Sequence, residues 1–548
     1  MLRVLLTALV LVPTAASAQT GGDLFAVRKN FALFGRIYET LASEYVDAVD
    51  AERLMRTGIG AMTGALDPYT VFFDEATTAA GRLQQGRDVG GVGLVVAQAG
   101  GRLVVAAVLD GSSAETQGVR PGDAVVTLVG RPAAGLSAAT ASGLLRGEPG
   151  STVAVEVDRE AAGGEADAAQ ERLRFQLVRA DEPRQEVTFS GWAGAPADGV
   201  AYVRLGDFLG PASAQIQAAL DGVRAQGEVR AVVLDLRGNP GGLLNEAVDV
   251  SGLFLPQGTL VTATRGRADG TAETYRTRAA PILPDVPVAV LVDRHSASAS
   301  EIVAGALQDH DRGVVVGETT FGKGLVQVVR PMPYGTAIKL TVSRYTTPAG
   351  REIQRLTYAQ GTTATAVADS SRRAFRTAGG RPVRSGGGIE PDVAVSLGEP
   401  SALEEALVRE AAFLRFANRY AAQHPTLPEG FRVDDALWAD FRRFVEAEGV
   451  TYQTPAERAV DALERDLTAA GTPATSETAA LRRVVEREKA RDVEANAPRL
   501  RARLRQEILS RSVGQRGLTE AALADDAVLA AARALVLDPA RYARTLGR

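Results

Sequence analysis

Hydrophobic positions divide the chain into stretches with different periods. Between residues 24 and 85 apolar side chains recur every three or four positions, which predicts helices. This helical register is set by Phe31, Phe34, Ile37, Tyr38, Leu41 and Tyr45. The segment Leu66–Thr70 (LDPYT) interrupts the register and predicts a turn. We therefore expect an N-terminal helical region over 24–85.

From residue 86 to 182 the pattern changes to short β-branched runs separated by glycines. Strands are predicted at Leu103–Leu109, Ala124–Leu128 and Thr152–Val157, and a short helix at Ala138–Leu145. The charged, Ala- and Gly-rich stretch Glu160–Glu171 is typical of an exposed hairpin loop. This part of the chain is predicted to be a small β-rich domain.

From about residue 183 to 355 strands alternate with helices, which is the pattern of an α/β core, and strand character returns at 388–395. The predicted strands are 199–205, 229–236, 286–292, 313–316, 326–330, 338–345 and 388–395, and the predicted helices are 212–223, a segment after Gly242, and 299–309. A Thr-, Ser- and Arg-rich segment, 355–386, predicts a loop excursion. From residue 400 onward Ala, Arg, Glu and Leu dominate without a strand signal, which predicts a C-terminal helical domain.

The first residues have the pattern of a signal peptide. Arg3 precedes the apolar run Val4–Val12, and Ala16–Ala18 (ASA) fits the small-residue cleavage pattern. The alternative is a membrane anchor, but the run is shorter than the roughly 20 residues that span a bilayer. Cleavage near Ala18 predicts an exported protein, periplasmic or secreted, whose contact with a membrane is peripheral at most.

Composition narrows the chemistry. A chain of 548 residues indicates several domains, and a net charge of −5 gives no sign of nucleic-acid binding. The absence of cysteine excludes disulfides, thiolate metal sites and cysteine nucleophiles. Three histidines leave little material for a zinc site, so we expect no metal and no cofactor.

The densest candidate chemistry is the run His295-Ser-Ala-Ser-Ala-Ser, where a predicted strand ends and a helix begins. A helix N-terminus offers unpaired backbone N–H groups and a partial positive charge, and both stabilise an oxyanion. A serine in this position can equally be a helix cap. The pattern alone therefore leaves Ser296, Ser298 and Ser300 as candidate nucleophiles.

Lys323 is the candidate general base. It lies between two glycines and between two apolar runs, so its amine can be buried. Burial lowers the pKa of a lysine, and a neutral amine can take the proton of a serine. The alternative is an exposed hairpin lysine. His310 follows Ser298 by twelve residues, about 18 Å along one helix, and cannot touch it. His295 is not excluded, but its place on the strand side favours a structural role.

Two glycine-rich segments could present backbone N–H groups. Asp235–Gly242 (DLRGNPGG) follows a predicted buried strand and could form half of an oxyanion hole. It lacks the Gly-Lys-Ser/Thr of a P-loop. Gly90–Leu94 (GGVGL), together with Gly118–Asp123 (GVRPGD), could bind a terminal carboxylate beside an exposed strand edge that pairs with a peptide. Plain turns are the alternative for both segments.

These segments occur in the order found in a known family. The chain resembles the carboxyl-terminal processing peptidases, also called tail-specific proteases, from about residue 30 to 398. The resemblance is carried by Tyr45–Asp47, Leu66–Thr70, Gly118–Asp123, Leu145–Gly150, Leu236–Gly242, Ser296–Glu301, Gly305–Asp309, Thr320–Gly324 with Gln327, Thr347–Arg351 and Gly388–Asp392. Many relatives have glycine where this chain has His295, and the helical region after residue 400 is not covered.

The resemblance implies a serine protease that uses a Ser–Lys pair. It selects Ser298 as the nucleophile, Lys323 as the general base and Gln327 as the residue that orients the lysine. Positions 323 and 327 share a face in a regular strand, which fits that role. It implies Asp309 as a supporting acid. It also implies an oxyanion hole from the N–H of Ala299 with Gly241 or Gly242, and a PDZ carboxylate-binding loop of Gly91, Val92, Gly93 and Leu94.

The fold implied is a multidomain α/β protein. Its expected parts are a signal peptide at 1–18, an N-terminal helical region at 24–85, an inserted PDZ-like domain at 86–182, a crotonase- or ClpP-like serine-protease core at 183–398 and a C-terminal helical domain at 400–548. The expected substrates are proteins or peptides with free C-termini, and the resemblance allows for an adaptor protein and a homodimer. A catalytically silent PDZ scaffold and a Ser–Lys hydrolase of small amides are the alternatives.

Overall fold

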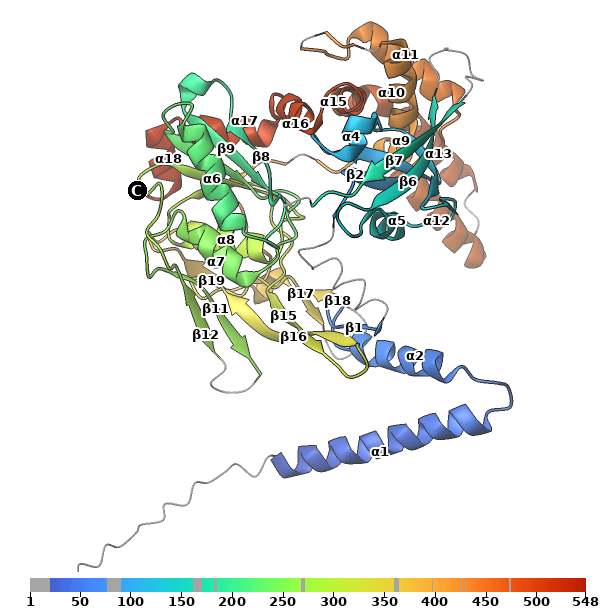
Figure 1. Cartoon of the computed structure of the whole chain (residues 1–548), viewed down its shortest axis with the longest axis vertical. Coiled ribbons are helices and arrows are strands. Elements are labelled where there is room, and N and C mark those ends of the chain that lie inside the picture. Colours follow the sequence, from blue (N-terminus) through green and yellow to red (C-terminus); the bar gives the residue numbers. More distant parts are fainter. Residues whose placement is uncertain are drawn as a thin grey trace, which may run out of the picture.

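The computed structural model describes residues 20–75, 90–160, 170–181, 185–267, 272–358, 364–396, 398–424, 426–428, 430–472 and 475–548. The expected signal peptide lies outside these residues. Three larger β-sheets and two short hairpins, with helices around them, make up the described chain (Figure 1). No helix in these ranges has the length and apolar character needed to cross a membrane.

The central sheet has six strands in the order β21-β14-β13-β10-β9-β8. Neighbouring strands are parallel except for β8 and β9. The strands are β8 Val187–Trp192, β9 Val200–Leu205, β10 Ala231–Asp235, β13 Val288–Val292, β14 Val314–Gly317 and β21 Val393–Ala394. The four inner strands are mostly apolar, with Arg204 in β9 and Asp235 at the end of β10 as charged exceptions, as expected of a parallel sheet buried on both faces.

Helices from distant parts of the chain cover the two faces of this sheet. Val203 and Leu234 pack with α6, α7 and α8 on one face, and their neighbours Tyr202 and Val233 pack with α17 and α18 on the other. The helices are α6 Ala212–Arg224, α7 Leu244–Gly252, α8 Ala299–Asp309, α17 Ala527–Val536 and α18 Pro539–Thr545. The helices after residue 400 are therefore divided between two places, and the last two complete the core.

A second, antiparallel sheet lies beside the central one, in the order β1-β16-β11-β12, with β15 paired to β16. Its strands are β1 Val71–Phe73, β11 Leu260–Gly266, β12 Glu273–Arg276, β15 Leu325–Pro331 and β16 Ala337–Thr346. The sequence pattern did not predict β1, β11 or β12. β1 ends the expected helical region early, because its apolar side chains pair with β16.

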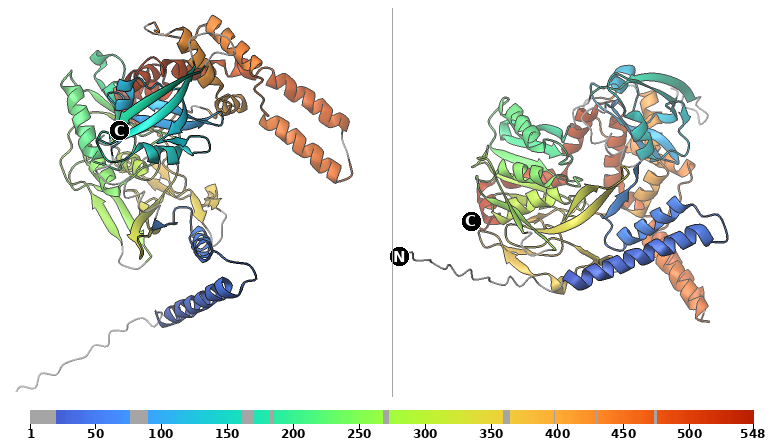
Figure 2. Two further views of the ribbon diagram at one scale, coloured as in Figure 1. Left: turned by 45° about the vertical axis from the view of Figure 1, so that its right-hand side comes forward. Right: turned by 60° about the horizontal axis from the view of Figure 1, so that its bottom comes forward.

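Of the two N-terminal helices, α1 (Thr20–Glu44) projects from the molecule, while α2 (Ala51–Gly64) packs beside β1 (Figure 2). The turn expected at 66–70 is confirmed: the Asp67 carboxylate accepts the backbone N–H groups of Tyr69 and Thr70, both at 2.8 Å. This turn leads the chain from α2 into β1 and places Tyr69 close to the core.

The third sheet, β2-β3-β4-β6-β7 with β5 paired to β4, is separate from the other two. Its elements are β2 Leu94–Ala99, β3 Arg102–Val108, α4 Ser113–Gln117, β4 Ala124–Leu128, β5 Arg131–Pro132, α5 Ala138–Leu145, β6 Thr152–Glu160 and β7 Gln170–Val178. β2 and β7 were not predicted. β6 and β7 extend into the two ends of the expected hairpin loop at 160–171, and residues 161–169 lie outside the described residues.

The remaining helices form a bundle beside the third sheet, and α12 and α13 extend from it as a pair (Figure 2). They are α9 Ala402–Arg409, α10 Ala412–Gln423, α11 Asp435–Ala447, α12 Pro455–Ala469, α13 Thr475–Lys489, α14 Asp492–Ala495, α15 Ala497–Leu509 and α16 Gln515–Leu523. α15 and α16 lead from this bundle to the core (Figure 1).

The loop predicted over 355–386 contains regular structure. Two short hairpins occur there: β17 Leu356–Tyr358 with β18 Ala364–Ala366, and β19 Ala374–Arg376 with β20 Pro382–Arg384. Their strands have three residues each, too short for a period to show in a sequence. The strand predicted at 388–395 is reduced to β21 Val393–Ala394, and Pro391, which cannot donate to a strand ladder, lies two residues before it.

Candidate active site

The three candidate serines have different environments. Ser296 and Ser300 are fully buried, and their hydroxyls donate to the backbone carbonyls of Leu236 (2.8 Å) and Asn239 (3.0 Å). Ser298 is partly exposed at the N-terminus of α8. Only Ser298 of the three therefore presents a hydroxyl to solvent, while the outer two fasten the turn to the 235–242 loop.

The backbone of Ser298 has φ 56° and ψ −111°. Positive φ is uncommon for a residue with a side chain and costs free energy, so it is kept where surrounding contacts enforce it. A strained turn between a strand and a helix is also how hydrolases of another fold expose a nucleophilic serine. The conformation of Ser298 is thus that of a presented side chain.

The carboxylate of Glu301 provides the contacts that enforce this turn. Its Oε2 accepts the backbone N–H groups of Ser298 and Lys323, both at 2.8 Å. Its Oε1 accepts the N–H of Gly322 (2.7 Å) and the hydroxyl of Thr320 (2.5 Å). Burial raises the pKa of Glu301, and these four donors oppose that shift. One buried side chain therefore joins the serine turn to the lysine segment.

Tyr345 of β16 joins the same two segments from the other side. Its buried hydroxyl lies 2.8 Å from the carbonyl oxygen of Lys323 and 3.1 Å from that of Ser298. Its backbone N–H donates to the carbonyl of Gly324 (3.0 Å). Burial raises the pKa of Tyr345 well above its ordinary value, so the hydroxyl stays protonated as a donor. The backbones around residues 298 and 323 are thus bound together through Glu301 and Tyr345.

The side chain of Lys323 is half-buried, and burial lowers its pKa. The positive charge of Lys339 lowers the pKa further, while Glu301 and Asp67 act in the opposite direction. The ammonium nitrogen lies 4.7 Å from the centre of the Tyr69 ring. Within the described residues, no hydrogen bond joins Lys323 to the hydroxyl of Ser298, so the lysine rests on Tyr69.

The role expected of Gln327, to orient Lys323, stays a prediction. The side chain of Gln327 donates to the hydroxyl of Thr341 (3.4 Å), and among the described residues no hydrogen bond joins it to Lys323. The expected common face depended on regular strand geometry. β15 begins only at Leu325, and its pairing with β16 shifts register between Val326 and Gln327. Such an irregularity re-aims the side chains that follow it.

The glycine-rich loop lies directly against the serine turn. A Cβ on Gly241, whose φ is 96°, would lie 2.7 Å from the nitrogen of Ala299 and 2.9 Å from the Cβ of Ser298. The N–H of Gly241 is already bound to the side chain of Asn239 (2.8 Å). Among the hydrogen bonds of the described residues, none uses the N–H of Gly242. Of the two glycines considered, Gly242 is therefore the available donor beside Ala299.

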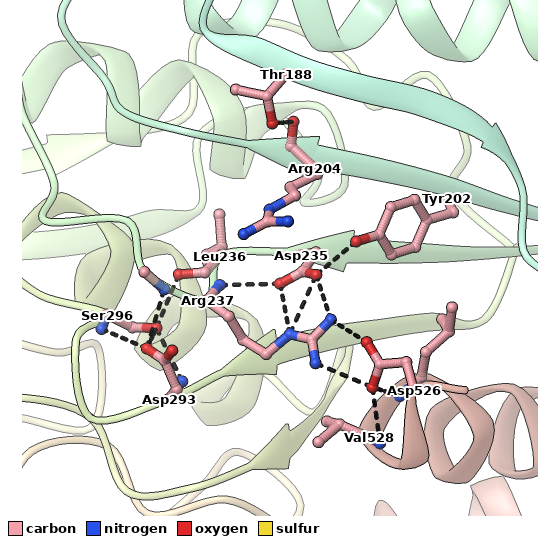
Figure 3. A network of polar contacts seen from close by, with 12 residues as sticks. Thr188, Tyr202, Arg204, Asp235, Leu236, Arg237, Asp293, Ser296, Asp526 and Val528 are labelled. Atoms are coloured by element: carbon pink, nitrogen blue, oxygen red, sulfur yellow. Dashed lines mark hydrogen bonds and ion pairs between the residues drawn. The ribbon is translucent and has the colours of Figure 1, made fainter. Parts of the chain in front are cut away.

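Asp293 fixes the approach of this loop. Its Oδ1 accepts the N–H groups of Gly238 (3.0 Å), His295 (2.9 Å) and Ser296 (3.0 Å) (Figure 3). The side chain of His295 is exposed, and that of His310 lies 2.7 Å from the carbonyl of Leu260, away from the serine turn. No group of three or more His, Asp and Glu that could hold a metal occurs in the described ranges.

Asp309 lies at the far end of α8, eleven residues after Ser298, or about 16 Å along the helix. Its carboxylate forms an ion pair with Arg351 (2.7 Å), and both side chains are buried. The second oxygen accepts the N–H of Ala349 (2.9 Å). Asp309 thus braces the segment after β16 and does not reach the serine.

The expected carboxylate-binding loop precedes β2, an edge strand of the third sheet. The N–H of Gly91 donates to the carbonyl of Ala180 (3.0 Å), so this glycine is fixed to the sheet and its N–H is not free for a ligand. The side chain of Val92 is buried, Gly93 has φ 75°, and Leu94 begins β2. α5 packs beside β2. Three of the four expected residues therefore remain candidates for the loop.

Glu301, Tyr345 and Asp293 were not assigned a role from the sequence. Glu301 was visible within Ser296–Glu301, three residues after Ser298, which is the spacing of a helix capping box. Tyr345 carried no signal beyond its place in an apolar run. The role of a buried linking residue depends on contacts between distant segments, which a single sequence does not display.

Comparisons with known proteins show which family the chain is similar to. Residues 199–365 match the model of Peptidase family S41, and residues 403–536 match that of "Probable PDZ-protease, C-terminal helical domain". The carboxy-terminal-processing protease of Bartonella bacilliformis is 32% identical over 329 residues, which cover 60% of this chain and 73% of that protein. The carboxy-terminal processing protease CtpB of Bacillus subtilis is 30% identical over 345 residues, 63% of this chain and 68% of that one.

The chloroplastic C-terminal processing peptidase of Tetradesmus obliquus is 38% identical over 302 residues, which cover 53% of this chain and 63% of that protein. Among solved structures, a photosystem II D1 C-terminal processing protease is 28% identical, with a TM-score of 0.38 over 73% of this chain and 92% of that one. The two relatives from Bartonella and Bacillus are similar over more than two thirds of their own length. The chain belongs to peptidase family S41, among the carboxy-terminal processing proteases.

Proposed function

We propose that this peptidase is an exported serine endopeptidase in which Ser298 is the nucleophile and Lys323 the general base. The observation that carries the proposal is the contrast among the three serines. The hydroxyls of Ser296 and Ser300 donate to backbone carbonyls, while Ser298 lies at a helix N-terminus with a strained backbone. That same turn shares the carboxylate of Glu301 with the lysine segment.

The first half of the reaction forms an acyl-enzyme. Neutral Lys323 takes the proton of the Ser298 hydroxyl, and the oxygen attacks the carbonyl carbon of the scissile peptide bond. For this step the amine leaves the Tyr69 ring, which its long, flexible side chain permits. The lowered pKa of Lys323 supports this role, because burial increases the neutral fraction near physiological pH.

The negative charge that develops on the carbonyl oxygen needs donors placed in advance. The N–H groups of Ala299 and Gly242 are the candidates, supported by the partial positive charge at the N-terminus of α8. The ammonium of Lys323 then returns its proton to the leaving amine. Water, deprotonated by the same lysine, releases the acyl group and restores Ser298.

The third sheet is proposed to capture the substrate as an inserted PDZ-like domain, beside a crotonase- or ClpP-like core. The edge strand β2 supports this, because an extended peptide can add to an exposed sheet edge. The loop of Val92, Gly93 and Leu94 would receive the terminal carboxylate. Export is proposed from the leader pattern that ends near Ala18.

Two substitutions test the chemistry with dye-labelled casein as an unstructured substrate. Ser298→Ala and Lys323→Ala are each expected to abolish cleavage while the circular dichroism spectrum and melting temperature stay unchanged. A fluorophosphonate probe is expected to label the wild-type chain once and Ser298→Ala not at all. Ser251→Ala is the matched control, because the buried hydroxyl of Ser251 donates to the carbonyl of Ala247 within its own helix α7 (2.8 Å), and this variant should keep the labelling.

Each result assigns the function. Full cleavage by Ser298→Ala would contradict the assignment of the nucleophile. A wild-type chain that binds C-terminal peptides but neither cleaves casein nor takes the probe would be a silent peptide-binding scaffold. Cleavage of small amides without cleavage of casein would indicate the second alternative, a small-amide hydrolase.

A further inference from the structure

Asp526, the residue before α17, is bound to Arg237 in the glycine-rich loop that carries the proposed oxyanion donor Gly242. The Oδ1 of Asp526 accepts the N–H groups of Val528 (2.9 Å) and Leu529 (3.0 Å) and so caps the helix. The same carboxylate forms a two-pronged ion pair with Arg237, with N–O distances of 3.0 and 2.6 Å (Figure 3). A capping residue of a C-terminal helix thus reaches the segment 235–242.

Arg237 is held from its other side by Asp235, which is fully buried at the end of β10. The Nε and Nη2 of the arginine lie 3.0 and 2.6 Å from the two carboxylate oxygens of Asp235. Asp235 also accepts the hydroxyl of Tyr202 (2.5 Å). Figure 3 shows the guanidinium between the two carboxylates. Because paired contacts of this kind fix the plane of a guanidinium, Arg237 has little freedom left.

The backbone that follows Arg237 needs such an anchor. Gly238 and Gly241 have φ of 71° and 96°. Glycine loses more backbone conformational entropy than other residues when it is fixed in one conformation, so contacts must hold this loop in place. The loop is tied at Gly238 to Asp293 and packs at Gly241 on Ser298. A displacement at Arg237 would therefore pass to Gly242, the proposed oxyanion donor.

We infer that Asp526 is a positioning residue for catalysis, which holds the loop 238–242 in register with Ser298 by clamping Arg237. This inference rests on the proposed function, because it assumes that Gly242 and Ala299 bind the oxyanion. The competing explanation is that the ion pair only docks α17 on the core. A second ion pair also docks α17 on the core but lies away from the loop. It joins Arg533 of α17 to Asp198, in the turn before β9, and can be removed for comparison.

The test compares Asp526→Asn with Asp198→Asn in the full mature chain. Asparagine keeps a capping oxygen and the side-chain volume but removes the charge that clamps Arg237. With labelled casein, Asp526→Asn is expected to lower kcat about tenfold or more, since small misplacements near the reacting atoms have effects of that size, and to leave KM within about twofold. Asp198→Asn is expected to leave both constants unchanged.

Amide hydrogen exchange gives a readout that does not depend on proteolysis. Asp526→Asn is expected to increase exchange in the peptide covering residues 236–243, and Asp198→Asn is not. Unchanged exchange and kcat in Asp526→Asn would overturn the inference, and so would equal losses in the two variants. If Ser298→Ala kept full activity, the proposed nucleophile would fail, and the exchange data alone would decide the role of Asp526. Asp526→Ser replaces Asp526→Asn if the latter does not fold.

Discussion

The hydroxyl of Tyr345 lies 2.8 Å from the carbonyl oxygen of Lys323, at the point where the lysine segment meets the serine turn. Tyr345→Phe keeps the buried ring and removes only this donor. We expect a loss of about 1–2 kcal/mol in the free energy of unfolding, because two partly buried carbonyl oxygens lose a donor. Urea denaturation measures the loss, and casein cleavage should fall as well.

Tyr358→Phe is a suitable control for Tyr345→Phe. The hydroxyl of Tyr358 makes a long hydrogen bond of 3.4 Å to that of Tyr69. No hydrogen bond of the described residues joins it to the backbone of Ser298 or Lys323. A Tyr345→Phe protein as stable and active as Tyr358→Phe would show that the hydroxyl does not hold the two segments together.

The pH dependence of activity is expected to respond to Lys339. Its positive charge lowers the pKa of Lys323, so Lys339→Gln should raise that pKa and reduce the neutral fraction of the base at any given pH. The rising limb of kcat/KM against pH should therefore move to higher pH. The profile is measured at low ionic strength, because salt screens the interaction between partly exposed charges.

Lys29→Gln provides the charge-matched comparison for Lys339→Gln, since Lys29 lies on the projecting helix α1. Its pH profile should coincide with that of the wild-type chain. A limb that moves equally in both variants, or moves to lower pH in Lys339→Gln, would contradict Lys323 as the titrating base.

Peptide capture is expected to depend on the backbone at Gly93. The φ of 75° disfavours any residue with a Cβ, so Gly93→Ala should distort the proposed carboxylate loop. We expect the affinity for a peptide with a free C-terminus, measured by fluorescence anisotropy, to fall about tenfold, and an amidated peptide to bind weakly to the wild-type chain.

Gly101→Ala introduces the same strain elsewhere in that sheet. Gly101 has φ 73° in the turn between β2 and β3, and nothing lies near its missing Cβ. Equal affinities for both peptides, or equal losses in Gly93→Ala and Gly101→Ala, would exclude the loop as the carboxylate site.

The order of strands and helices from β9 to β14 could be predicted because most of these strands are apolar runs and each helix has its own period, whereas β8 was not predicted. The sequence of β10, Ala-Val-Val-Leu-Asp, even implies cover on both faces, since no position alternates to polar before its end. It does not say which segment covers the second face. That segment, α17, lies nearly 300 residues later, and its pattern fits any apolar surface.

The candidate site shows the same division between local and distant information. Ser298 and Lys323 could be named from short motifs and their resemblance to a family. Gln327 donates to Thr341 after a shift of register in β15, and the N–H of Gly241 donates to the side chain of Asn239. Both effects depend on how one segment meets another, which local spacing does not encode.

The ion pair between Arg237 and Asp526 also bears on when the enzyme becomes active. Its partners are 289 residues apart in the chain. Contacts at such a separation form late, because the intervening polypeptide must first be brought together. The segments that carry Ser298 and Lys323 can therefore fold before α17 docks on the core. The clamp would form only when α17 has docked, so full proteolytic activity would follow the last stage of folding.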